Sequence, residues 1–206
     1  MEQPVNILQA LKNSQYISAS PQTFTHYDVF IDGEVGDPSE YRELIATLFN
    51  AGEGDTMAIY INSPGGNLDS ALAIIEGLKN TSAHVTGVII GACHSAASLI
   101  SMYCADVAVM DNAYSLVHTA SFGSSGNTNN VKSHTEFTVK MVEKLLNDTY
   151  EGFLSKDELN KVKQGVELWF DADEIRERMQ SRGKFIQTKV NKIIKEKNKK
   201  VIKESE

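Results

Sequence analysis

The sequence predicts an α/β fold in which βαβ units repeat around a largely parallel sheet. Two observations support this class. Short, β-rich apolar runs alternate with segments whose apolar residues recur at helical spacing, and turn residues separate them. The 206 residues, 41% hydrophobic and 23% charged, are enough to bury one full core. We expect an N-terminal arm at 1–25, a main domain at 26–181 and a basic tail at 182–206.

The first half of the chain alternates strand and helix patterns. Strands are expected at 27–31, 57–61 and 85–90, and helices at 38–51, 68–78 and 95–103. Residues 1–25 precede this pattern with weak periodicity and many polar side chains, which indicates a loosely ordered arm. Pro38 occupies a favourable first-turn position in the first of these helices.

The second half contains shorter strands and one long helix. Strands are expected at 107–110 and 116–117. A long helical pattern then runs from Val131 to Leu154, after a Gly/Ser/Asn-rich loop at 121–130. A last helix is expected at 172–179, and Trp169-Phe170 precedes it.

The C-terminal tail is strongly basic. Nine Lys or Arg residues and three Glu residues give 182–206 a net charge of +6, and since the whole chain carries −7, the rest carries −13. The tail also has an apolar stripe at helical spacing, made of Ile186, Val190, Ile193, Ile194, Val201 and Ile202. Two interpretations stay open: an amphipathic helix that docks on an acidic partner or an adjacent subunit, and a solvated, frayed helix.

Composition argues against several protein classes. An acidic body does not favour non-specific nucleic-acid binding. Cys93 and Cys104 lie in apolar contexts without metal-ligand spacing, which argues against a disulfide scaffold or a metal site and indicates a reducing, cytoplasmic location. No run approaches the roughly 18 apolar residues of a membrane span, and the N-terminus lacks the pattern of a secretory signal.

Three turn motifs follow expected strands. Ser63-Pro64-Gly65-Gly66 closes the strand at 57–61, a run of small residues from Gly91 to Ser98 closes the strand at 85–90, and His118 ends a short apolar run. The carboxyl ends of parallel strands meet at one edge of a sheet, so we expect these motifs to converge. Glycine amides, a serine in a tight turn and a histidine base together indicate a serine hydrolase with an oxyanion hole.

Spacing alone leaves the nucleophile and the base open. Ser95 is the preferred nucleophile because it stands at the strand-to-helix bend, and its rivals are Ser63, Ser98 and Ser101. Ser63 is expected to cap the following helix instead. The base is His118 or His94. Consecutive residues entering a helix point about 100° apart, so His94 is poorly placed to face the adjacent Ser95 hydroxyl.

The motifs from Ile61 to Ser98, followed by His118, resemble those of ClpP-type serine peptidases, the Clp protease proteolytic subunits of peptidase family S14. The resemblance covers about Tyr27 to Met179. It implies a ClpP/crotonase-like fold with a protruding handle at about 121–154, a homo-oligomeric ring (a double heptamer in the family) and peptide or protein substrates. It also implies an AAA+ unfoldase as partner, and neither metal nor cofactor.

The resemblance also assigns site residues. It implies Ser95 as nucleophile, His118 as base, and the N–H groups of Gly66 and Ala96 as the two oxyanion-hole donors. The assignment of the third triad member is less direct. Ungapped counting from His118 reaches Glu167 where the family has an aspartate. Asp171 is the rival, although its position, with Glu174 three residues later, is typical of a helix N-cap in a capping box.

Other functions stay open beside an ATP-dependent serine endopeptidase. The Glu167 substitution and the bulky His94 leave room for a catalytically silent ring or scaffold subunit. The small size and the tail also resemble phage-type ClpP-like proteases that mature capsids. A crotonase-type acyl-CoA hydratase shares the fold but has no use for Ser95 with His118. A Ser–Lys signal-peptide peptidase is disfavoured because no membrane segment is found.

Overall fold

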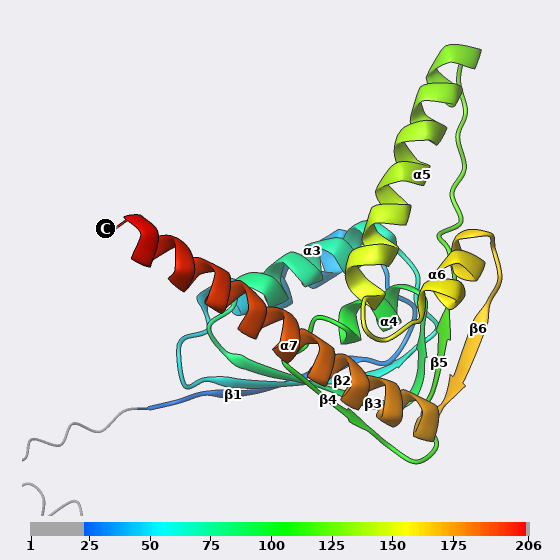
Figure 1. The fold of residues 1–206 in the computed structure, drawn as a ribbon. Helices are drawn as coiled ribbons and strands as arrows, with labels where there is room; N and C mark the ends of the chain where they lie inside the picture. Colours follow the sequence, from blue (N-terminus) through cyan, green and yellow to red (C-terminus); the bar gives the residue numbers. More distant parts are fainter. Residues whose placement is uncertain (1–22, 205–206) are drawn as a thin grey trace, which may run out of the picture.

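The computed structural model describes residues 23–204 and forms a six-stranded sheet with helices packed on it (Figure 1). Most of the arm expected at 1–25 lies outside the described residues. The strands are β1 (His26–Ile31), β2 (Thr56–Ser63), β3 (His84–His94), β4 (Asp106–Val109), β5 (Tyr114–Val117) and β6 (Leu168–Asp171). Their order is β1-β2-β3-β5-β6, with β4 also paired to β3. All of these pairings are parallel except that of β6 with β5. The predicted α/β class with a largely parallel sheet is confirmed.

Strand β3 runs further than the sequence pattern predicted. Its first part, Thr86–Ile89, pairs with β4, and its last part, Ala92–His94, pairs with β5. The prediction ended this strand at Ile90 because the small residues that follow carry little β propensity. Pairing with two successive neighbours overrides that propensity and carries the strand up to the turn at Ser95.

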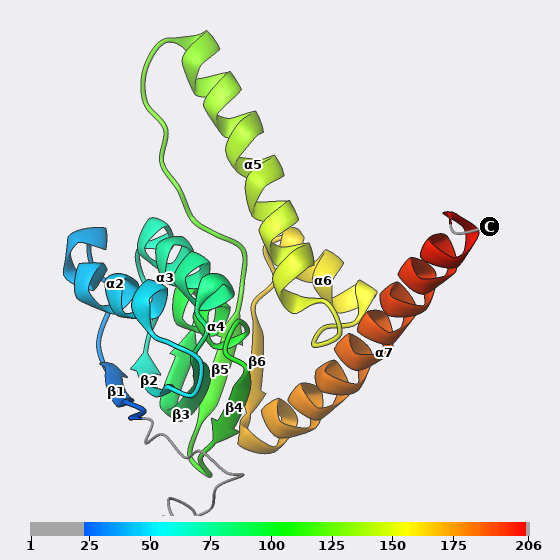
Figure 2. The same ribbon diagram turned by 90° about the vertical axis from the view of Figure 1, so that its left-hand side faces the viewer.

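The helices are η1 (Pro38–Tyr41), α2 (Arg42–Asn50), α3 (Leu68–Asn80), α4 (Ala96–Ser101), α5 (Thr128–Tyr150), α6 (Lys156–Lys163) and α7 (Ala172–Glu204). Helix α3 packs between α2 and α4, and the three lie together beside the sheet (Figure 2). The side chain of Asn67 caps α3 by accepting from Ser70 N at 3.0 Å. The expectation that Ser63 caps this helix was therefore wrong, because the Pro-Gly-Gly turn lies between Ser63 and the helix start at Leu68 and leaves Asn67 at the N-cap position.

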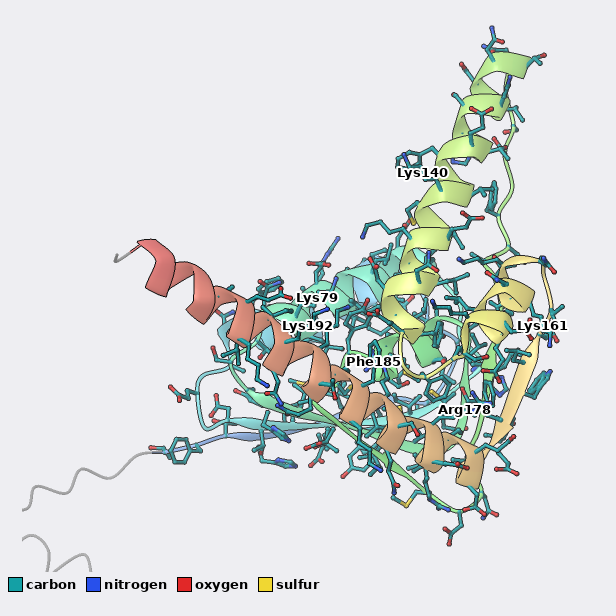
Figure 3. All side chains as sticks on the ribbon, viewed as in Figure 1. Lys79, Lys140, Lys161, Arg178, Phe185 and Lys192 are labelled. Carbon is teal, nitrogen blue, oxygen red and sulfur yellow. The ribbon has the colours of Figure 1, made fainter. Side chains whose placement is uncertain are left out.

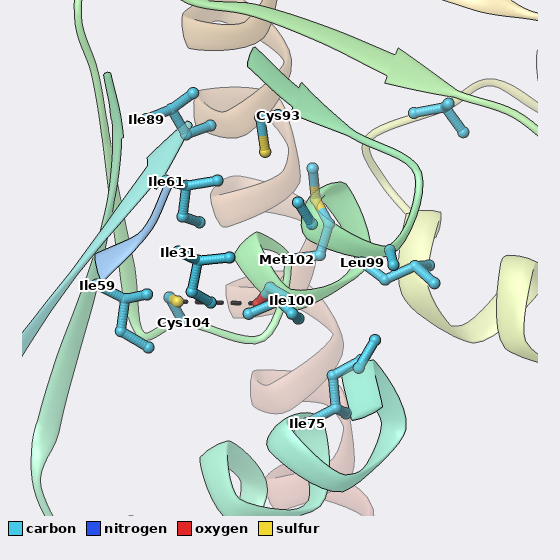
Figure 4. Close-up of a cluster of buried hydrophobic side chains, with 14 of the residues drawn as sticks. Ile31, Ile59, Ile61, Ile75, Ile89, Cys93, Leu99, Ile100, Met102 and Cys104 are labelled. Carbon is cyan, nitrogen blue, oxygen red and sulfur yellow. Dashed lines mark hydrogen bonds between the residues drawn. The ribbon is translucent and has the colours of Figure 1, made fainter. Parts of the chain in front are cut away.

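The core lies between the sheet and α3, α4 and the start of α7. Apolar side chains that alternate along β1, β2 and β3 are almost completely buried, among them Ile31, Ile59, Ile61 and Ile89 (Figure 4). Cys93 and Cys104 are free, buried thiols, as expected from their apolar contexts. Burial raises the pKa of each to about 12, which keeps both protonated and unreactive at neutral pH.

Helix α5 stands out from the body, and the segment that connects β5 to it runs outward beside it to its far end (Figures 1 and 2). This arrangement matches the handle that the family resemblance implied. The helix begins at Thr128, capped by Asn127, and ends at Tyr150, four residues before the predicted end. The polar helix α6 then follows, and it was not predicted because Val162 is its one buried residue.

Helix α7 is much longer than predicted. It continues from Ala172 to Glu204 without interruption and so includes most of the tail. Arg178 binds Glu158 of α6 through two hydrogen bonds, of 2.7 and 3.1 Å, which hold the first half of α7 to the body (Figure 3). Within residues 23–204, none of the helices is both long enough and apolar enough to cross a bilayer.

Candidate active site

Ser95 occupies a strained turn between β3 and α4. Its φ of 51° makes it the one non-glycine residue with positive φ within residues 23–204. Such a conformation costs a side-chain-bearing residue about 1–3 kcal/mol and persists only where the surroundings enforce it. Here Ser95 N donates to Leu116 O at 2.9 Å, and Ser95 O accepts from Leu99 N at 3.1 Å. These two bonds hold the turn between strand and helix in place.

The three rival serines are enclosed in the protein. Ser63, Ser98 and Ser101 are all at most 1% exposed. Ser63 Oγ accepts from Gly65 N at 3.1 Å, and Ser101 Oγ donates to Ser98 O at 2.8 Å. Ser95, in contrast, lines an open cavity of about 660 Å³. Of these four hydroxyls, only that of Ser95 is available to a substrate.

The Gly65-Gly66 turn approaches Ser95 more closely than a side chain would allow. Gly65 has φ +89°, and a Cβ there would lie 2.6 Å from His94 O and 2.7 Å from Ser95 Cβ. A Cβ on Gly66, with φ +147°, would lie 2.4 Å from Val35 O. Bonds from Val35 N to Gly65 O (2.8 Å) and from Asn67 N to Val35 O (2.7 Å) fix this turn. Glycine is needed at both positions because of both the space and the backbone angle.

Two backbone amides near Ser95 are free to bind an anion. Neither Gly66 N nor Ala96 N donates a hydrogen bond to an acceptor among residues 23–204, and both residues line the same cavity as Ser95. Ala96 is the first residue of α4, where amides have no partner within the helix. This is the arrangement expected of two oxyanion-hole donors.

His118 follows directly after β5 and lines the cavity together with Ser95. Among the described residues, the side chains of Ser95 and His118 form no hydrogen bond with each other. In free enzymes catalytic hydrogen bonds are often long and tighten only when substrate binds. The relevant finding is therefore that Ser95 and His118 line the same cavity.

His94 is not among the residues that line this cavity. Its ring packs edge-on against Tyr114 and Trp169, with centroids 4.9 and 5.2 Å apart, on the neighbouring strands β5 and β6. Burial lowers the pKa of His94, and the nearby His118 lowers it further, so His94 stays neutral at physiological pH. The two aromatic neighbours accommodate a bulky residue where the family resemblance implied a small one.

The antiparallel pairing of β5 with β6 separates the two candidates for the third triad member. Val117 pairs with Leu168, so continuing the register by one residue sets Glu167 opposite His118. Directly opposite residues project to the same face of the sheet. Glu167 is exposed, and its carboxylate makes no ion pair with His118 within the described chain.

Asp171 lies at the other end of this ladder, opposite Tyr114. Four residues of strand separate it from Glu167, which is about 13 Å at the usual rise per residue. Its side chain accepts from Glu174 N at 2.9 Å, and Glu174 in turn accepts from Asp171 N at 3.1 Å. The predicted capping box is confirmed, and it commits the Asp171 carboxylate to the start of α7.

The contribution of α5 to the cavity was not predicted from the sequence. Beyond Ser95 and His118 the cavity has an apolar wall, formed by Leu99, Met141, Val142, Leu145 and Leu146. Four of these belong to α5, at i, i+1, i+4 and i+5 on one helix face. The same periodicity was visible in the sequence and predicted a long helix, but periodicity does not distinguish a cavity wall from a core. In the described residues, no group of three His, Cys, Asp or Glu side chains comes together to hold a metal ion.

Comparison with known families gives a match over most of the chain. A family model described as Clp protease matches residues 12–178, which include both glycines of the turn, Ser95, His118 and Glu167. The match spans most of the chain and ends within α7, before the basic tail. The chain belongs to the Clp protease family.

Proposed function

We propose that this protein is a ClpP-like serine endopeptidase that cleaves peptide bonds through an acyl-enzyme. One observation carries the proposal: a serine on a strained strand-to-helix turn shares a cavity with a histidine and with two unpaired backbone amides. Family membership supports a serine protease in general, and the cavity residues supply the groups that this chemistry needs.

The reaction begins when the His118 imidazole takes the proton from Ser95 Oγ, which attacks the scissile carbonyl carbon. The resulting oxyanion is bound by the N–H groups of Gly66 and Ala96. His118 then gives its proton to the departing amine, the C–N bond breaks, and an ester remains on Ser95. Water, deprotonated by His118, attacks this ester and releases the acid product. Glu167 acts as the third member by orienting the imidazole and stabilising its cation.

The apolar wall of the cavity supports a preference for substrates with a large apolar side chain before the cleaved bond. That side chain enters next to Ser95, where Leu99 and the α5 residues Val142 and Leu146 are buried and offer no polar partner. A charged side chain would lose its hydration there without compensation. Short fluorogenic peptides that differ only in Leu, Ala or Glu at this position test the preference, with Leu expected to be cleaved fastest.

An exposed apolar patch supports an unfoldase as partner. Phe30, Tyr60 and Val88 lie in one register row across β1, β2 and β3, and Ile90 and Met110 share their face of the sheet. The exposed fractions of Phe30, Ile90 and Met110 are 61%, 40% and 45%. The ring of Phe30 stacks on that of Tyr60, with the two centroids 4.8 Å apart. Contiguous apolar patches of this kind mark docking sites. Assembly into a ring that an AAA+ unfoldase feeds is the role we propose for this subunit.

Labelling with a fluorophosphonate probe tests the chemistry without knowledge of the natural substrate. We expect the wild type to be labelled, and the label to be lost in Ser95→Ala and His118→Ala. Glu167→Ala should react more slowly. An assembled wild type that stays unlabelled, with and without an unfoldase, would contradict the proposal and favour a catalytically silent ring subunit.

A further inference from the structure

The second half of α7 has an apolar face that no other part of residues 23–204 covers. In the first half of the helix, Ala172, Ile175 and Met179 pack against the core. Continuing at the same helical spacing, the face runs on through Ile186, Val190, Ile193 and Ile194, which are 41 to 50% exposed. We call these four residues the projecting face. The helix extends beyond the body at this point (Figures 1 and 2).

The direction of this half of α7 is set by contacts on a neighbouring side of the helix. Phe185, labelled in Figure 3, packs on Gly152 just after the end of α5. Lys189 Nζ forms an ion pair with Glu151 Oε2 at 2.5 Å. These contacts anchor the helix but leave the projecting face open. An amphipathic helix draws most of its stability from packing of its apolar face, so a cover for this face is expected in the assembled protein.

The opposite end of the molecule complements the tail in charge and in apolar character. Residues 23–55, which include β1, η1 and α2, carry eight acidic residues and one arginine, a net charge of −7. We call this region the acidic edge. It exposes the ring of Phe49 on α2, at 54%. The tail, residues 182–206, carries +6.

One chain cannot bring these two regions together. Figure 2 shows β1 and α2 at one end of the molecule and the end of α7 at the other. Contact between them therefore needs two copies, arranged head to tail. Pairing of two α7 helices is disfavoured, since both carry the same positive charge. A head-to-tail contact repeated by rotation closes into a ring, the kind of assembly that the Clp protease family forms.

We propose that the projecting face of α7 docks on the acidic edge of a second copy of this chain. The apolar side chains of α7 cover the exposed ring of Phe49, while the opposite net charges of the two regions steer the copies into this orientation. The family match ends at residue 178, so the projecting face is a feature of this chain beyond the matched region. The proposal is independent of the chemistry at Ser95.

Measurement of the assembly mass tests the docking face. Ile186→Asp/Val190→Asp places two carboxylates on the projecting face, and the matched control Thr188→Asp/Asn191→Asp makes the same charge change on the polar side of the helix. By mass photometry of full-length protein, we expect the control to keep the wild-type assembly and the face variant to fall to smaller species. Equal masses for the wild type and both variants would overturn the proposal, given unchanged thermal unfolding of the protomers.

Site-specific photo-crosslinking identifies the occupant and does not depend on a destabilising variant. A benzophenone amino acid at Val190, in a mixture of ¹⁵N-labelled and unlabelled copies, should capture peptides from residues 23–55 of the other copy. The same probe at Thr188 should capture none of them. Capture of a second α7, of another surface, or of no copy at all from Val190 would show that the acidic edge is not the docking site.

Discussion

The Tyr150 hydroxyl donates a hydrogen bond to Ser98 Oγ over 3.0 Å and joins the base of α5 to α4, the helix that begins after Ser95. Both residues are buried, at 1% and 0% exposure. No side chain caps α4, so its position depends on packing and on bonds of this kind. The bond therefore links the helix that walls the cavity to the helix that carries the strained turn.

Removal of this bond should both weaken the fold and slow the reaction of Ser95. In Tyr150→Phe, Ser98 Oγ stays buried without its donor, which costs about 1–3 kcal/mol in the free energy of unfolding. Urea titration measures that loss, and the rate of fluorophosphonate labelling measures the effect on Ser95. Tyr103→Phe is the control, because the Tyr103 hydroxyl bonds Thr149 at 3.2 Å and does not touch α4. Labelling rates that fall equally in both variants would argue against a specific link to the nucleophile.

The Gly65 position should be intolerant of any side chain. A Cβ there would lie 2.6 Å from the backbone oxygen of His94 and 2.7 Å from Ser95 Cβ, and the backbone has φ +89°. Gly65→Ala must therefore displace the turn that presents the Gly66 amide. Loss of one oxyanion donor lowers the rate about 100- to 1,000-fold, and we expect a loss of that order in peptide hydrolysis.

The control for this prediction is Gly123→Ala, at a glycine where a Cβ would meet nothing within 4 Å. It should keep wild-type activity and stability. An active Gly65→Ala variant would mean that the turn can shift without loss of the oxyanion hole.

Glu167 and Asp171 should respond oppositely to substitution. Glu167→Gln removes the charge that orients His118, and we expect its labelling rate to fall at least about tenfold with little change in stability. Asp171→Ala removes the N-cap of α7, which costs about 1 kcal/mol in the free energy of unfolding, and its labelling rate should stay near that of the wild type. Labelling rates and thermal unfolding of the two variants distinguish these outcomes. The reverse pattern would assign the third triad member to Asp171.

Much of the fold could be predicted because local pattern and tertiary context agree. Strands β2 and β3, which contain the buried residues Ile59 and Ile89, lie inside the sheet, and their apolar runs are typical of buried parallel strands. The predictions failed where tertiary contacts decide the outcome. Strand β3 continues through small residues because β5 pairs with it, and α7 continues past Met179 although most of its later residues are exposed.

The candidate site was predictable to a similar degree. The turn at Gly65, the bend at Ser95 and the strand end at His118 each have a local signature, so the sequence placed them at one edge of the sheet. The cavity wall on α5 has no signature of its own, since Val142 and Leu146 look like ordinary core positions. The Tyr150 bond to Ser98 spans 52 residues, and nothing in the local sequence of either partner indicates it.

The ion pair of Glu158 with Arg178 should make the stability of the protein depend on acid pH. Hydrogen bonding from Arg178, with further bonds from Ser155, lowers the pKa of Glu158 from 4.5 to about 2. Because the folded pKa is the lower one, the ionised carboxylate stabilises the fold fully above about pH 4.5, and this stabilisation is lost as the pH falls toward 2. Glu158→Gln should therefore melt at a lower temperature than the wild type at pH 7, and the gap should narrow between pH 4.5 and 2. Asp157→Asn, which breaks only an exposed pair with Lys161, should show little difference at any pH. A gap for Glu158→Gln that stays constant down to pH 2 would show that the contact with Arg178 does not favour the ionised carboxylate.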